Sequence, residues 1–337
     1  MNSVRVFIES LGPLGPWVLL ALFMASSFLL IWRLERMTES GVEGTVLGTL
    51  VMPYCSGIGN LIFVFVVGSS KVAGTEVMTN CLVNNVTNMT LLIGLPTIFW
   101  GLNVLPKAKA KTKARSKKKK RDNDEHRINR LSLLLTLTAV LFFTGTVWAL
   151  GVDGRITFSD GLVLVGLFLF WQCFHVFEVL KANVRQNKSL NWMLAVDFAL
   201  LLVAAFGTYI SIDGLVAWIS SIQTGFISAT NLGWLTGWLM VVPNGLLALY
   251  YGWHGKPEVV YTSQVGDGHI CIPLCVGLYS LINPIDVPVF FHTGIFVLAG
   301  ATIVHALFVT VLGGLPRFMG WAMTVAYGFF LYKGLIG

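Results

Sequence analysis

Long apolar segments separated by short polar turns make up most of this chain. Ten of these segments are long enough to cross the hydrocarbon core of a bilayer, which takes about 20 helical residues. They lie near residues 11–33, 44–68, 76–103, 131–151, 158–180, 191–211, 215–253, 259–282, 288–312 and 316–336. The region 213–253 fits either one tilted span after a re-entrant piece or two spans. We count it as one.

Composition supports this reading of the pattern. Of the 337 residues, 55% are hydrophobic and only 12% are charged, and the mean hydropathy is +0.75. A soluble protein of this size could not hide so much apolar surface. Because helices satisfy their own backbone hydrogen bonds in lipid, we predict an all-α membrane protein of about ten transmembrane helices that lies in the lipid bilayer.

The basic residues are concentrated in one place. Twelve of the 23 Lys and Arg residues lie between Lys107 and Arg130. Such a block is typical of a solvated loop that contacts anionic lipid headgroups, and we do not expect it to bind nucleic acid. We therefore predict a disordered polybasic loop over residues 106–130.

Loop charge also predicts the orientation. If the ten spans alternate, one set of loops carries nineteen Lys and Arg residues and the other set carries four. The positive-inside rule makes the first set, which includes 106–130, cytoplasmic, and places both termini outside. We expect an integral protein of the cell (inner) membrane.

The spans divide into two halves of five at the basic loop 181–188, which predicts repeats over residues 1–188 and 189–337. A repeat of five spans must enter the membrane the second time from the opposite face, and inverted repeats of this kind place a substrate site near the midplane. The halves also match in detail. Asn60 in "SGIGNLIFVFVVG" corresponds to Asn244 in "VVPNGLLALYYGW", and a second polar cluster follows each by about twenty residues.

These later clusters, "TNCLVNNVTN" and "TSQVGDGHIC", are polar stripes within apolar sequence. On an α-helix, Asn80, Asn84, Thr87 and Asn88 fall within an arc of roughly 100°, with Asn85 just off its edge. In the second cluster the stripe contains Ser263, Gln264 and Asp267. Two such stripes in inverted halves are best satisfied by facing each other. The side chains of these stripes could serve only to hydrogen-bond one helix to another. Their number and the intramembrane Asp favour instead a hydrated ion or solute site.

The layout resembles the cation/calcium antiporters, which include the sodium/calcium exchangers. Members of that family have ten spans in two inverted repeats, each with a Gly-Thr-Ser-Leu-Pro-Glu turn and a Gly-Asn-x-x-Gly-Ser-Asn-x-x-Asn helix start. The residues in register with the turn are Cys55 to Asn60 and Leu239 to Asn244. Asn80, Asn85 and Asn88 are in register with the three asparagines of the helix start.

The resemblance implies a secondary-active cation antiporter that works by alternating access. In the family the Glu of each turn is the principal calcium ligand, and Asn60 and Asn244 stand at those positions here. Ca²⁺ prefers several carboxylates among about six to eight oxygen ligands, so we expect it to bind weakly. Asp267 alone could hold one monovalent cation or a proton. The cargo is left open among sodium, calcium and protons.

The predicted ion-binding residues are Ser56, Asn60, Asn80, Asn84, Asn85, Asn88, Asn244, Ser263, Gln264 and Asp267, with Asn60, Asn244 and Asp267 as the expected metal ligands. Helix breaks near Gly57, Gly59 and Pro243 would free backbone carbonyls for an ion. Asp267 has a structural alternative, which is to cap a helix broken at its two flanking glycines. Asp197 is either a proton-linked group or a hydrogen-bonded structural residue.

Two other functions stay open. One is an exchanger-fold carrier of a different substrate, and the other is a non-transporting membrane receptor or scaffold that uses the polybasic loop for contacts. The sequence has no phosphate-binding P-loop, no Gly-x-Ser-x-Gly elbow and no metalloprotease helix. We therefore expect neither an enzyme nor a resident cofactor.

Overall fold

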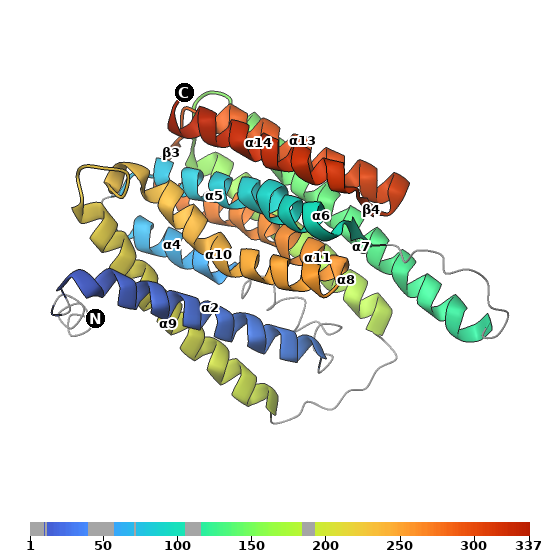
Figure 1. The fold of residues 1–337 in the computed structure, drawn as a ribbon. Coiled ribbons are helices and arrows are strands. Elements are labelled where there is room, and N and C mark those ends of the chain that lie inside the picture. Colours follow the sequence, from blue (N-terminus) through green and yellow to red (C-terminus); the bar gives the residue numbers. More distant parts are fainter. Residues whose placement is uncertain (1–9, 11, 40–56, 71, 105–115, 184–192) are drawn as a thin grey trace. The chain divides into compact units, whose positions relative to one another are not determined.

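The computed structural model describes residues 10, 12–39, 57–70, 72–104, 116–183 and 193–337, and most of its regular structure is helical (Figure 1). The first half contains η1 (Gly12–Leu14), α2 (Gly15–Glu39), α4 (Ile58–Gly68), α5 (Thr75–Thr87), the π-helix η2 (Asn88–Leu92), α6 (Ile93–Trp100), β1 (Leu102–Asn103), α7 (Ser116–Leu150), β2 (Arg155–Ile156) and α8 (Phe158–Asn183).

The second half repeats this order of elements. It contains α9 (Met193–Ser221), η3 (Ala229–Asn231), α10 (Leu232–Trp253), α11 (Pro257–His269), the π-helix η4 (Ile270–Cys275), α12 (Val276–Ser280), β3 (Ile285–Asp286), α13 (Phe291–Leu312), β4 (Gly314–Leu315) and α14 (Arg317–Leu335). In both halves a 13-residue helix, α5 or α11, runs directly into a π-helix.

Within the described residues, the predicted spans agree with these helices except in the sixth and seventh, and residues 44–56 of the second predicted span lie outside the described part of the chain. Counting α5–η2–α6 and α11–η4–α12 once each, the described residues form ten helical segments. By length and composition, six helices among the described residues could cross a membrane, and α4 and the apolar part of α8 are shorter. The predicted end near residue 211 is wrong. Helix α9 continues to Ser221, and the chain turns later, where Gly225 has a φ of +91°.

The predicted disorder of residues 106–130 is wrong for 116–130, which form the start of α7. Residues 105–115 lie outside the described part of the chain. Lys and Arg are good helix formers, and extending an existing apolar helix avoids the cost of a new nucleus. A run of like charges is therefore compatible with helix where it directly precedes a membrane-spanning helix.

Contacts between residues divide the chain into two compact units. Unit 1 comprises Met1–Cys81, Asp153–Pro243 and Ile270–Val287, and unit 2 comprises Leu82–Val152, Asn244–His269 and Pro288–Gly337. Each unit thus draws helices from both halves of the sequence.

In unit 1, α2 and α9 lie side by side (Figure 1). Gly214 packs on Leu19 and Gly207 packs on Ser26, so the two helices run antiparallel, and neither glycine leaves room for a Cβ. One heptad farther along, Arg33 forms a buried ion pair with Asp197, with Nη1 and Oδ1 3.2 Å apart. The structure thus gives Asp197 the structural role of the two alternatives.

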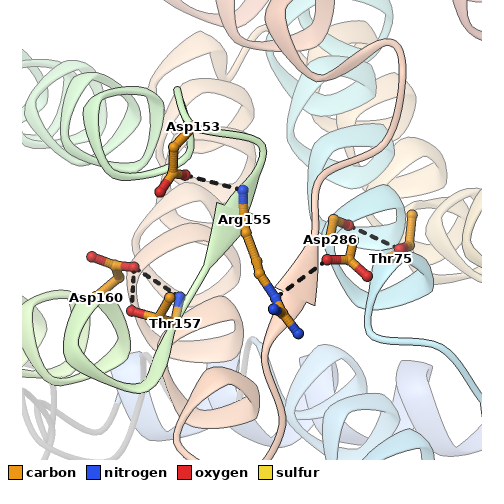
Figure 2. Close-up of polar contacts among 6 residues, drawn as sticks. All are labelled: Thr75, Asp153, Arg155, Thr157, Asp160 and Asp286. Atoms are coloured by element: carbon orange, nitrogen blue, oxygen red, sulfur yellow. Dashed lines mark hydrogen bonds and ion pairs between the residues drawn. The ribbon is translucent and has the colours of Figure 1, made fainter.

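A short ribbon closes one end of unit 1, where β2 pairs with β3 (Figure 2). Arg155 Nε lies 3.4 Å from Asp286 Oδ1, and the Thr75 hydroxyl donates to the Asp286 carbonyl oxygen at 2.8 Å. Helix α8 begins beside this ribbon, where Asp160 accepts from both the N–H and the hydroxyl of Thr157, each at 2.7 Å. These contacts join the end of α12 to the loop between α7 and α8.

Unit 2 has the matching ribbon, in which β1 pairs with β4. Helix α6, which precedes β1, packs closely against α14, where a Cβ on Gly320 would lie 2.7 Å from the Gly94 carbonyl oxygen. In each unit the ribbon therefore ties the end of a π-interrupted helix to the loop before the last helix of a sequence half. In both ribbons, a strand from one half of the sequence pairs with a strand from the other half.

Candidate functional site

Asp267 is the centre of a polar cluster inside unit 2. It lies on α11 with 2% of its surface exposed. Its Oδ2 atom accepts hydrogen bonds from Nδ2 of Asn88, at 3.2 Å, and from Nδ2 of Asn244. Three separate elements, η2, α10 and α11, thus bring one carboxylate and two carboxamides together.

The Asn-rich stripe supplies the next contacts. Asn88 Nδ2 also donates to Asn84 Oδ1 at 3.0 Å, as expected for residues four apart on a helix. Asn85 lies on the same helix, and its Oδ1 would be 3.5 Å from a Cβ on Gly268, the residue after Asp267. The two predicted polar stripes therefore meet, with Asn88 and Asp267 as the point of contact.

Gln264 and Ser263 complete the cluster on α11. Gln264 Nε2 donates to the Asn244 carbonyl oxygen at 3.3 Å and to the Ser263 hydroxyl at 3.0 Å. Gln264 Oε1 and Asn88 Oδ1 are buried and have no hydrogen-bond partner among the described residues. Asn244 and Ser263 are only partly buried, so they form the edge of the cluster.

Two predicted site residues belong to unit 1. Asn60 is buried on α4, with 4% of its surface exposed. Asn80 is fully buried on α5, where its Nδ2 lies 3.0 Å from Thr236 Oγ1 and 3.7 Å from Met240 Sδ, both on α10. Ser56 lies outside the described residues.

Thr236 was not among the predicted site residues, although it is the partner of Asn80. It is buried, and its own hydroxyl donates to the Leu232 carbonyl oxygen at 2.7 Å, which leaves its oxygen free to accept from Asn80. A single Thr in an apolar run gives little signal on its own. The need of Asn80 for a partner in another span was the available clue.

Of the three expected helix breaks, only the one near Gly57 coincides with a helix end. Helix α10 runs through Pro243, and Gly59 lies within α4, whose first residue follows Gly57. The interruptions within the described helices are instead the π-helices η2 and η4. Proline has no backbone N–H, so the helix loses one hydrogen bond to the carbonyl four residues earlier. A helix can continue past this point with a kink when neighbouring helices pack against it.

The capping role considered for Asp267 is also wrong. Helix α11 continues through both Gly266 and Gly268, so Asp267 lies inside the helix and not at an end of it. Its side chain contacts amides from other elements. The carboxylate is thus held by tertiary hydrogen bonds.

Comparisons with known proteins agree with this architecture. The family model described as "Sodium/calcium exchanger protein" matches residues 13–177. Structures of the sodium-calcium exchanger NCX_Mj match the fold. One soaked with 10 mM Na⁺ and zero Ca²⁺ has 18% sequence identity and a TM-score of 0.64, and the match covers 99% of this chain and 100% of that chain. Another, soaked with 2.5 mM Na⁺ and 1 mM Sr²⁺, has 16% identity and a TM-score of 0.64 and covers 98% of each chain. None of the curated proteins matches the chain.

The chain is thus similar to the sodium/calcium exchangers, in sequence over residues 13–177 and in fold over nearly its whole length. The exchanger family and fold are those of integral membrane cation carriers and not of enzymes. In this chain Asp267 contributes the carboxylate of the polar cluster, and Asn88 and Asn244 contribute amides.

Proposed function

We propose that this antiporter carries a monovalent cation, Na⁺ or H⁺, at a site built on Asp267, and that Ca²⁺ is at most a weak ligand. The observation that carries the proposal is the buried Asp267 carboxylate held by Asn88 and Asn244. Burying a carboxylate away from water without a counter-charge costs several kcal/mol, and one positive charge beside it offsets that cost.

The charge of the site argues against a divalent ion. Among the described residues, no group of three or more His, Cys, Asp and Glu side chains comes together. Ca²⁺ would retain a net positive charge beside Asp267 alone, in surroundings of low dielectric. A single Na⁺ or H⁺ leaves the site neutral.

The amides could serve as ligands for the cation by rotating. As they lie, the Asn88 and Asn244 nitrogens face the carboxylate. A half-turn about the last side-chain bond would exchange nitrogen and oxygen and direct an oxygen toward a cation. Asn88 Oδ1 and Gln264 Oε1 have no partner among the described residues, so turning either amide would break only the hydrogen bonds that its nitrogen donates.

We further propose that the repeats over 1–188 and 189–337 give alternating access to a site that the remaining predicted residues help to form. The repeated order of elements supports this, as do the two ribbons, β2–β3 and β1–β4. The residues proposed to act with Asp267 are Ser56, Asn60, Asn80, Asn84, Asn85, Asn88, Asn244, Ser263 and Gln264.

The orientation and the lipid contacts are also proposals. Nineteen of the basic residues fall in one set of loops, which supports cytoplasmic placement of 106–130 and external termini in the cell (inner) membrane. The basic start of α7 would lie along that surface and attract anionic headgroups.

Flux in liposomes tests the proposal. Purified protein should exchange ²²Na⁺ or move protons down an imposed gradient, and should move ⁴⁵Ca²⁺ far more slowly. Absence of all three fluxes from well-folded protein would favour the receptor or scaffold alternative. Rapid calcium flux would contradict the proposed cargo.

A further inference from the structure

The π-helix η2 begins at Asn88, the residue that joins Asn84 to Asp267. Where a π-helix returns to α-helical bonding, one backbone carbonyl is passed over and needs another donor. At the end of η2 the Ile93 N–H bonds to the Thr90 carbonyl oxygen. The carbonyl one residue earlier, that of Met89, is hydrogen-bonded to a side chain.

That side chain is His305 of α13. Its Nε2 lies 2.8 Å from the Met89 carbonyl oxygen, and none of its surface is exposed. Because a carbonyl oxygen only accepts, Nε2 carries the hydrogen, and in the neutral imidazole Nδ1 then carries the lone pair. The ring also stands edge-on to Tyr261, with centroids 5.6 Å apart, which fixes its plane.

We propose that His305 is a positioning residue for the cation site, and that its bond to Met89 holds η2 in the register that directs Asn88 at Asp267. The inference rests on the proposed function, because it assumes that Asn88 and Asp267 bind the cargo. His305 itself touches neither of them in this arrangement. It acts through the backbone beside Asn88.

Two other roles for His305 predict different behaviour. A histidine that only fills space could be replaced by an apolar side chain without loss of cation affinity. A histidine that carries the transported proton could not be replaced by glutamine. The positioning role requires one N–H donor of similar reach, which glutamine supplies and leucine does not.

The first test is hydrogen exchange, which does not depend on transport. We would compare wild type, His305→Gln and His305→Leu, with His292→Leu as the control, since His292 is exposed on the same helix. Amides of residues 89–94 should exchange faster in His305→Leu only. Equal protection in all four proteins would overturn the proposal.

The second test is Na⁺ affinity measured by half-saturation of ²²Na⁺ exchange. His305→Leu should raise the half-saturating concentration roughly tenfold, as loss of one good hydrogen bond allows, and His305→Gln should stay within about twofold. In an Asn88→Ala background, His305→Leu should add little, because its effect passes through Asn88. Full additivity of the two changes would contradict a role through Asn88.

These tests separate the two proposals. If Asp267→Asn leaves Na⁺ exchange unchanged, the proposed cation site is wrong, and the exchange of residues 89–94 still decides whether His305 holds η2. If Asp267→Asn abolishes Na⁺ exchange and His305→Leu behaves as wild type, the site stands and the positioning role is wrong.

Discussion

The side-chain nitrogen of Asn88 lies 3.2 Å from Asp267 Oδ2 and 3.0 Å from Asn84 Oδ1. One amide thus links the polar stripe of the first sequence half to the acid of the second. Both donated hydrogen bonds come from the same nitrogen, so turning this amide would change both contacts at once. The predictions below follow from this arrangement and from the packing around it.

A second carboxylate at the cluster should create calcium affinity. Asn244 already contacts Asp267, so Asn244→Glu would place two acids side by side. Two carboxylates are far better matched to a divalent ion, and we expect Ca²⁺ affinity to rise at least about tenfold. Calorimetry on purified protein measures this. Submicromolar calcium binding by wild type would show that ligands outside the proposed set compensate.

The two glycines that flank Asp267 should respond differently to alanine. A Cβ on Gly266 would meet open space, whereas one on Gly268 would lie 3.0 Å from Val140 Cγ2 and 3.5 Å from Asn85 Oδ1. Gly266→Ala should therefore stabilise α11 by about 0.5–1 kcal/mol, and Gly268→Ala should lose that gain to crowding and weaken Na⁺ binding. Thermal unfolding and ²²Na⁺ exchange measure the pair. Identical behaviour of both variants would contradict the packing at Gly268.

Breaking the ion pair between α2 and α9 should destabilise the protein. The side chains of Arg33 and Asp197 are only 11% and 7% exposed, so Asp197→Ala leaves a buried guanidinium without its carboxylate. We expect a loss of roughly 3 kcal/mol, seen as a lower Tm, with the pH dependence of flux unchanged. Loss of pH dependence at normal Tm would instead make Asp197 a proton-linked group.

The exposed pair of Figure 2 is the matched control. Arg155 and Asp286 are 56% and 78% exposed, so solvent screens their attraction. Asp286→Asn should leave the Tm almost unchanged. A drop as large as that of Asp197→Ala would mean that the ribbon contributes more than its exposure suggests.

Topology can be tested by labelling single cysteines in intact cells. Val289, which is 98% exposed, lies just after the 283–287 loop and should be reached from outside as Val289→Cys. Ala110→Cys, in the basic region, should be protected until the membrane is permeabilised. The background needs Cys173 replaced, because it is exposed. Labelling of residue 110 from outside would reverse the orientation and remove the support for the repeat boundaries.

Apolar period and loop charge were enough to predict most of the helices, because a bilayer imposes span length directly on sequence. These two signals failed where the residues of a segment are compatible with more than one local structure. The sixth span was expected to end near residue 211, yet α9 runs through Asp213, and the chain turns only near Gly225. The Lys-rich start of α7 was read as disordered for its charge, although its residues favour helix.

The two polar stripes were predictable from the helical spacing of their residues. That the stripe with Asn88 faces the stripe with Asp267 was predictable as well. The π-helices were not, since a shift from i+4 to i+5 bonding leaves no fixed sequence pattern. The role of His305 could not be predicted either, because its partner is the Met89 carbonyl, which no side-chain pattern reveals. Thr236 was missed for a similar reason, as its role depends on which helix lies beside Asn80.

The most direct test of the account is Na⁺ exchange by wild type and Asp267→Asn in liposomes at about pH 6 and about pH 8, with Tm measured for both proteins. Protons and Na⁺ compete for the same carboxylate, so wild type should need more Na⁺ for half-saturation at the lower pH. Asp267→Asn keeps nearly the same volume and should lose exchange, or its pH dependence, at an unchanged Tm. A well-folded Asp267→Asn protein with wild-type, pH-dependent Na⁺ exchange would contradict the proposed site.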